Sequence, residues 1–188
     1  MYASGLTSQA LRSRLSCRLA FPALRPSAHY TTSAPAKKLY PLLGRYTVLP
    51  TELFRINSST DVVLRDYAMQ QEKDRTSYDL HIQEDGLVHP KPGPNFEGPN
   101  GMSLRPQGFF LQELIRGFKG RNITIYRLPE GLQLPDDLVC LHEHTDHHSI
   151  QCAVPMTLRT LNQKLTDLCV KHGESMTKQE FVHRYPFM

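Results

Sequence analysis

The densest group of side chains capable of chemistry lies between His142 and Gln151, in the segment HEHTDHHSIQ. Imidazoles are the commonest transition-metal ligands in proteins and also transfer protons near neutral pH. Histidines two residues apart on a strand share a face, so His142, His144 and, across a turn, His147 could hold a zinc or iron ion. The residues alone leave two interpretations open: a three-histidine metal site of a small hydrolase, or a solvated polar turn.

The same segment contains the His-x-His-x-Asp-His ligand string of the metallo-β-lactamases. Here the string lies in the last quarter of the chain, and most of the sequence after it has a helical pattern. Too little sequence remains to supply the further His and Asp ligands that this family needs. We therefore exclude that family.

Two alternating runs position these residues, LVCLHEH at 138–144 and HHSIQCA at 147–153. They predict an antiparallel hairpin around Thr145 and Asp146. With an even loop, one face is apolar and packs on the core; it contains Val139, Leu141, Ile150 and Cys152. The opposite face is expected to carry the chemistry, and it collects Cys140, His142, His144, His147, Ser149 and Gln151.

The remaining elements alternate between strands and helices. The patterns predict strands at 45–49, 52–56 and 122–128, and a hairpin formed by 78–82 and 86–89 around an Asp-Gly turn. They predict helices at 61–73, with Thr60 as N-cap, at 107–119, and at 158–171, with Thr157 as N-cap. Residues 89–101 are rich in Pro and Gly and predict a loop. This order predicts an α+β domain.

The charge of the chain is unevenly distributed. Residues 1–40 contain six basic residues and no acidic one, whereas the rest has 18 acidic and 16 basic residues. The sequence after residue 40 therefore lacks the basic surplus typical of nucleic-acid binding, and we expect no nucleic-acid partner. No apolar run approaches the roughly 20 residues of a membrane-spanning helix, so we expect no membrane insertion.

Residues 1–40 have the composition of a mitochondrial presequence, because they are rich in Arg and Ser, free of acids and able to form a basic amphipathic helix near 11–24. We expect cleavage near Tyr30 and Thr31 and a folded domain at 41–188 in the mitochondrial matrix. The alternative is a disordered basic tail on a cytoplasmic protein.

Three cysteines remain after such cleavage: Cys140, Cys152 and Cys169. Their number is odd and they lack the C-x-x-C spacing, so we interpret them as structural thiols. A nucleophilic pair of Cys140 with His142 is sterically possible, although no oxyanion signature accompanies it.

Four short motifs occur in order along the chain: LFRI at 53–56, DGLVHP at 85–90, GMS at 101–103 and HHSIQCAVPM at 147–156. Together they resemble the Tse-type toxin domain, an ADP-ribosyltransferase-like family known from type VI secretion effectors and also present in fungi. The resemblance runs from about Leu53 to Lys164 and suggests a fungal-type homologue. This chain has His148 where the family often has an aromatic residue, and Cys152 where it often has a proline.

The resemblance implies an ADP-ribosyltransferase-like fold, in which two small antiparallel sheets with flanking helices form a cleft for NAD as substrate. It implies that Arg55 anchors the dinucleotide, since a guanidinium matches phosphate oxygens in two places. By the same resemblance Gln151, Ser103 and His147 are the expected catalytic residues. NAD binding is assigned to Arg55, Ser103 and Ser149, and no metal is assigned.

The expected activity is therefore NAD cleavage or transfer of ADP-ribose to a protein acceptor, with an antitoxin-like protein as a further partner. Gln151 carries no charge, and no Gln/Glu-x-Glu pair precedes the last helix. Two alternatives consequently stay open. One is a catalytically inactive module that binds NAD or another nucleotide and acts through a partner, and the other is the small His-metal hydrolase.

The targeting prediction can be tested with a fusion of residues 1–45 to a fluorescent reporter. We expect the fusion to enter mitochondria, and replacement of Arg12, Arg14 and Arg18 by Glu to abolish import, because presequences are positively charged. Fluorescence microscopy checks both results. A cytosolic unmodified fusion would show that the prediction is wrong.

Overall fold

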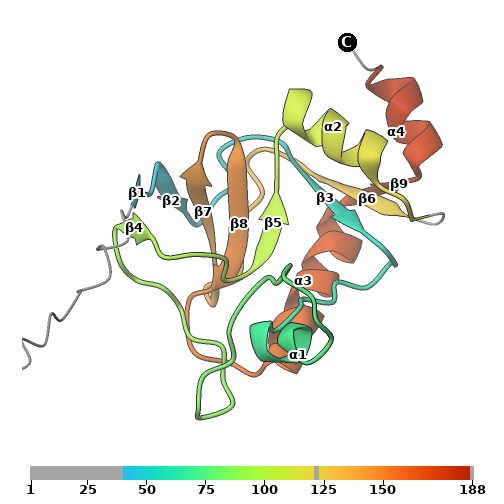
Figure 1. The fold of residues 1–188 in the computed structure, drawn as a ribbon. Coiled ribbons are helices and arrows are strands. Elements are labelled where there is room, and N and C mark those ends of the chain that lie inside the picture. Colours follow the sequence, from blue (N-terminus) through green and yellow to red (C-terminus); the bar gives the residue numbers. More distant parts are fainter. Residues whose placement is uncertain (1–39, 121–122, 187–188) are drawn as a thin grey trace, which may run out of the picture. The chain divides into compact units, whose positions relative to one another are not determined.

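The computed structural model describes residues 40–120 and 123–186 (Figure 1). The chain separates into two units, 1–36 and 37–188, and the described residues all belong to the second. The predicted presequence lies outside the described residues except for Tyr40.

A four-stranded antiparallel sheet contains the predicted hairpin. Its strand order is β2 (Gly44–Tyr46), β7 (Leu138–His144), β8 (His147–Cys152) and β5 (Met102–Leu104). The hairpin of β7 and β8 is confirmed, and its turn is formed by Thr145 and Asp146. Thr145 takes a positive φ of 46° there.

A second antiparallel sheet has the order β3 (Leu53–Asn57), β6 (Thr124–Leu128) and β9 (Glu174–Met176). The two sheets meet where Phe54 of β3 pairs with Arg105, the residue after β5, through N–H···O bonds of 2.7 and 3.1 Å. A separate ribbon pairs β1 (Tyr40–Pro41) with β4 (Asn95–Phe96). The small antiparallel sheets agree with the predicted α+β class.

Four helices are present in the described residues: α1 (Tyr67–Gln71), α2 (Phe109–Gly117), α3 (Leu158–His172) and α4 (Lys178–Arg184). The predicted N-cap of α3 is confirmed, because the Thr157 hydroxyl accepts a hydrogen bond from the Thr160 N–H at 3.2 Å. None of the helices in 40–120 and 123–186 is long and apolar enough to cross a membrane.

Two apolar clusters hold these elements together. The larger lies against α3 and combines Leu161, Leu165 and Leu168 with inward side chains of both sheets, such as Ile150 of β8 and Leu128 of β6. The smaller is formed under α2 and α4 by Phe54, Leu111, Ile115, Ile125 and Phe181. Neighbouring residues Leu53 and Phe54 enter different clusters because side chains alternate across β3.

The predicted helix at 61–73 is mostly wrong, since only α1 is helical there and its N-cap is Asp66 rather than Thr60. Residues 62–65 have no regular secondary structure, and Asp66 forms an isolated bridge with Leu80. The Val62 N–H donates to the Thr166 hydroxyl at 2.9 Å, and the Leu64 N–H donates to the Asn162 amide oxygen at 3.0 Å. These side chains of α3 satisfy backbone groups that a helix would have used, and β-branched valines favour the extended form.

The predicted hairpin at 78–89 is also wrong as a pair of strands. Its Asp-Gly turn forms, with Gly86 at a φ of 79°, but the two arms bond elsewhere. Leu80 forms a bridge with Asp66, and Val88 exchanges backbone hydrogen bonds with Met156 at 2.8 and 3.1 Å. The arms are therefore tied to other segments rather than to each other.

The predicted faces of the central hairpin require correction. A bulge between His142 and His144 inserts one residue into β7, so that Cys140 pairs with Ile150 and Val139 pairs with Gln151. Cys140 therefore joins Ile150 and Cys152 in the core, while Val139 and Leu141 move to the face of Ser149 and Gln151. A one-residue shift exchanges the faces of a whole strand.

The core position of Ile150 gives a stability prediction. Ile150 is 0% exposed, whereas Val63 is 66% exposed. We expect Ile150→Asp to lower the free energy of unfolding by more than about 4 kcal/mol, because it buries an unpaired carboxylate. The matched substitution Val63→Asp should change it by less than about 0.5 kcal/mol. Denaturant unfolding of both variants measures the difference, and similar losses in the two would contradict the assigned core.

Candidate functional site

The bulge in β7 directs two consecutive side chains, Glu143 and His144, to the same side of the hairpin. Glu143 contacts His147, Ser149 and Gln151 of β8, and the His144 ring stacks on that of His147 with centroids 5.0 Å apart. A regular strand would have sent Glu143 and His144 to opposite faces. The irregularity thus collects a carboxylate and two imidazoles at one end of the sheet.

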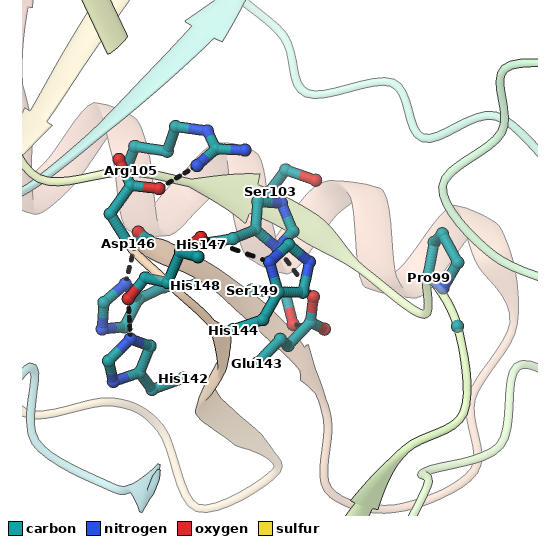
Figure 2. Close-up of polar contacts among 12 residues, drawn as sticks. Pro99, Ser103, Arg105, His142, Glu143, His144, Asp146, His147, His148 and Ser149 are labelled. Atoms are coloured by element: carbon teal, nitrogen blue, oxygen red, sulfur yellow. Dashed lines mark hydrogen bonds and ion pairs between the residues drawn. The ribbon is translucent and has the colours of Figure 1, made fainter. Parts of the chain in front are cut away.

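Glu143 is the centre of this group, although its side chain is only 1% exposed. Its Oε1 accepts hydrogen bonds from the Ser149 hydroxyl at 2.6 Å and from the Gln151 amide at 3.1 Å. Its Oε2 lies 2.7 Å from Nδ1 of His147. Figure 2 shows Glu143, His147 and Ser149 directed toward one another. Three polar partners therefore compensate the burial of the carboxyl group.

A cavity of about 410 Å³ lies where the two sheets meet. One part of its wall is polar and includes Arg55, Ser103 and His147. Another part is apolar and comes largely from Leu111 and Leu114 of α2 and from Phe118, the C-cap of that helix. Three of the residues predicted for the site therefore line the same cavity.

A second cavity of about 240 Å³ adjoins the first. Glu143, His144 and Ser149 line it, together with the aromatic side chains of Tyr78 and Phe96. Five residues belong to the walls of both cavities: Arg65, Asp79, Ser103, Arg105 and His147. The two cavities are consequently neighbouring compartments of one site.

Three arginines line the larger cavity: Arg55, Arg65 and Arg105. Among them, Arg55 alone has no carboxylate partner in the described residues. Its Nε donates to the Asn57 amide oxygen at 2.8 Å, and its Nη1 donates to the Ser103 carbonyl at 3.2 Å. Burial lowers the pKa of Arg55 below its ordinary value, while the nearby Asp79 carboxylate opposes that shift. An arginine remains charged in proteins, so the cavity wall carries a positive charge that neutral groups hold in place.

The two other arginines of the site are paired. Arg65 contacts both carboxylate oxygens of Asp79 at 2.7 and 2.8 Å, which raises the pKa of Arg65. Arg105 forms an ion pair with Asp146 in the turn of the hairpin (Figure 2). Their charges are largely neutralised, which leaves Arg55 as the stronger attractor for an anion.

Gln151 is close to the other predicted residues but lines neither cavity. Its amide nitrogen donates to Glu143 and to the Ser149 hydroxyl, and its amide oxygen accepts from the Asn100 side chain at 3.1 Å. Ser149 lines the smaller cavity and Ser103 lines both. The catalytic role expected for Gln151 stays a prediction, and its observed contacts are those of a residue that supports Glu143.

The three histidines of the possible metal site do not come together. His142 lies on the opposite face, stacked on His148 with ring centroids 4.1 Å apart (Figure 2). In the described residues a different group, Glu143, His144 and His147, places ligand atoms within 4.8 Å of one another. Because Glu143 already has three polar partners and the two imidazoles are stacked, this arrangement would have to open before it could hold an ion.

Burial lowers the pKa of His144 and that of His148, and neighbouring histidines add to both shifts. These rings therefore favour the neutral form near neutral pH.

The three cysteines within the described residues line neither cavity. Burial raises the pKa of Cys140 to about 12, that of Cys152 to about 11 and that of Cys169 to about 12. A thiol that remains protonated is a poor nucleophile. The burial of Cys140 argues against its pairing with His142 as a nucleophile, and the interpretation of the cysteines as structural thiols agrees with their burial.

Sequence reasoning missed Glu143 and Asn100 as parts of the site. Glu143 occupied the variable position of the histidine string, and a regular alternation placed it toward the core. Asn100 lies in the Pro- and Gly-rich segment 89–101, whose composition predicts only a loop. A carboxylate at a buried position indicates a group of polar partners around it, because such groups are rarely buried unless they are paired. The burial of Glu143 can be recognised only when the register of β7 and β8 is known.

Comparison with known proteins gives one match. The family model described as Tse2 ADP-ribosyltransferase toxin matches residues 51–181, which includes β3, both cavities, the central hairpin and α3. No curated protein and no solved structure matches the chain. Since the match spans well over half of the sequence, the chain belongs to the Tse2 ADP-ribosyltransferase toxin family.

Proposed function

We propose that the two cavities bind NAD and that the protein cleaves its nicotinamide–ribose bond, releasing ADP-ribose or transferring it to an acceptor. The observation that carries this proposal is Arg55, a half-buried cation without an ion-pair partner in the described residues, on the wall of a cavity that also contains Ser103 and His147. Membership of an ADP-ribosyltransferase toxin family supports NAD as the substrate.

The shape of the site suits a dinucleotide. NAD consists of two nucleosides joined by a diphosphate, and the protein has two compartments with a common wall. The Arg55 guanidinium donates a hydrogen bond to the backbone carbonyl of Ser103, a residue of that common wall. A diphosphate beside Arg55 would place one nucleoside against the apolar side chains of α2 and the other in the smaller compartment near Glu143.

The smaller compartment has the groups that bond cleavage requires. Loss of nicotinamide leaves positive charge on the ribose, and a fixed carboxylate or fixed dipoles stabilise that charge. Glu143, Ser149 and Ser103 line this compartment. We therefore place the nicotinamide ribose there and assign its hydroxyl contacts to the two serines.

The toxin family suggests two further partners, a protein that accepts ADP-ribose and an inhibitor that protects the producing cell. Both belong to this proposal, as does a mitochondrial destination for the chain, which rests on the composition of residues 1–40.

The direct test is to incubate the purified full chain with NAD and to measure nicotinamide by chromatography. Release of nicotinamide is expected, and calorimetric titration should show one NAD per chain. Binding without turnover would favour an inactive NAD-binding module instead. Absence of both binding and turnover would contradict the proposal.

Replacement of Arg55 tests the site. We expect Arg55→Ala to weaken NAD binding by about 1.5–3 kcal/mol, the usual range for hydrogen bonds to charged groups, or roughly ten- to a hundredfold in affinity. Arg55→Lys should recover part of the loss, because an ammonium lacks the two-pronged geometry. Calorimetric titration measures both variants.

The matched control is Arg75→Ala, which removes an exposed arginine that lines neither cavity. Its NAD affinity should equal that of the unmodified chain. Unchanged binding in Arg55→Ala would refute the assignment of the diphosphate to this residue.

A further inference from the structure

We propose that Glu143 is a positioning residue for His147: it holds the hydrogen on Nδ1 and thereby leaves Nε2 as the proton acceptor for the group that attacks NAD. This inference rests on the proposed function and extends it to the proton transfer. Water or a hydroxyl of an acceptor would be the attacking group.

The first support is the contact between the two residues. Oε2 of Glu143 lies 2.7 Å from Nδ1 of His147, whose side chain is 16% exposed. A carboxylate can only accept hydrogen bonds, so the nitrogen that faces it must carry the hydrogen. No hydrogen bond within the described residues engages Nε2 of His147. Because His147 lines both cavities, Nε2 is the ring nitrogen available to a ligand.

The second support is a series of hydrogen bonds that runs from Asn100 to Glu143. The donor and acceptor of each bond follow from the orientation of the Asn100 amide. The Asn100 amide nitrogen donates to the backbone carbonyl of His89 at 2.9 Å, which orients that amide. The same nitrogen donates to the Gln151 amide oxygen, so the Gln151 nitrogen must point toward Ser149 and Glu143. Since Ser149 accepts from Gln151, its own hydrogen is free to donate to Glu143.

Oε1 of Glu143 is thus occupied by two donors, and Oε2 remains for His147. This arrangement fixes the carboxylate against rotation. It also explains why Gln151 is buried beneath the cavities rather than in their walls: it orients Glu143, and Glu143 orients His147. Positioning partners of this kind set the tautomer of a histidine and the direction of its free nitrogen.

The proposed proton transfer is balanced without a further reagent. The attacking oxygen forms a bond to C1′ of the nicotinamide ribose, and its proton passes to Nε2 of His147. The bond between C1′ and the nicotinamide nitrogen breaks, and its electron pair neutralises the positive pyridinium ring. The imidazolium that forms is stabilised by Glu143 through Nδ1–H. It returns to the neutral form by releasing the proton to solvent.

The tautomer can be tested without any turnover. Long-range ¹H–¹⁵N NMR of the full chain, labelled at histidine, distinguishes the two ring nitrogens. We expect the Nδ1–H tautomer for His147 in the unmodified protein. Glu143→Gln can turn an N–H toward Nδ1, so the hydrogen should move to Nε2. Nε2 protonated in the unmodified protein, or the same tautomer in both proteins, would overturn the proposal.

Steady-state kinetics of nicotinamide release supply the second measurement. Glu143→Gln should lower kcat by about a hundredfold, the usual contribution of a positioned general base. KM for NAD should change less than about threefold, since Arg55 and the serines remain. The control Glu174→Gln, on an exposed ion pair of β9, should keep both values. A rise in KM with unchanged kcat would overturn the role in proton transfer.

If Glu143→Gln does not fold, Glu143→Asp provides the same comparison, because a side chain shorter by one methylene keeps its charge but no longer reaches Nδ1. Retained kcat in Glu143→Asp, together with an altered His147 tautomer by NMR, would also overturn the proposal. If the unmodified chain releases no nicotinamide, the proposed function fails, and the tautomer measurement alone then decides whether Glu143 orients His147.

Discussion

The buried carboxyl group of Glu143 is the constraint on which the site depends. A carboxylate removed from water costs several kcal/mol unless hydrogen bonds replace its hydration. Its partners come from a single strand, since His147, Ser149 and Gln151 alternate along one face of β8. They can reach Glu143 only because the bulge turns it toward them. The bulge in β7 therefore brings Glu143 to its partners, and the polar side chains of β8 compensate the burial that results.

The three arginines of the site differ in the partners that hold them. Arg55 is held by an amide and a backbone carbonyl, whereas Arg65 and Arg105 are paired with Asp79 and Asp146. The pairing of Phe54 with Arg105 joins the two sheets beside these residues. An anion can therefore approach Arg55, whose guanidinium has no carboxylate partner in the described part of the chain, while the carboxyl group of Glu143 remains in the adjoining compartment. This separation of charge suits a substrate with a diphosphate and a positively charged nicotinamide ring.

Local signals predicted the elements that depend on local interactions. The hairpin at 138–153 and the helix capped by Thr157 are confirmed because alternation, turn residues and the cap all lie within the segment itself. The helix at 61–73 was wrong because Asn162 and Thr166, about a hundred residues away, bind its backbone. The short β9 was missed because Met176 is stabilised by the distant smaller cluster. Helix α4 was missed although its start carries a local signal, the capping box of Thr177 and Glu180.

The site was predictable in part of its membership but not in its geometry. Motif resemblance identified Arg55, Ser103, His147 and Ser149, all of which line the cavities. Alternation could not reveal the bulge, because residues 138–141 are all apolar and buried, so their pattern fits either register. Regular alternation therefore places Glu143 on the wrong side, and the substrate contact expected of Gln151 stays a prediction.

A crystal structure of the full chain with a non-cleavable NAD analogue tests the proposed site most directly. We expect the diphosphate within hydrogen-bonding distance of the Arg55 guanidinium and the nicotinamide ribose in the smaller compartment, with C1′ facing Nε2 of His147. An analogue bound away from Arg55, or with its ribose outside the compartment lined by Glu143, would contradict the proposed site.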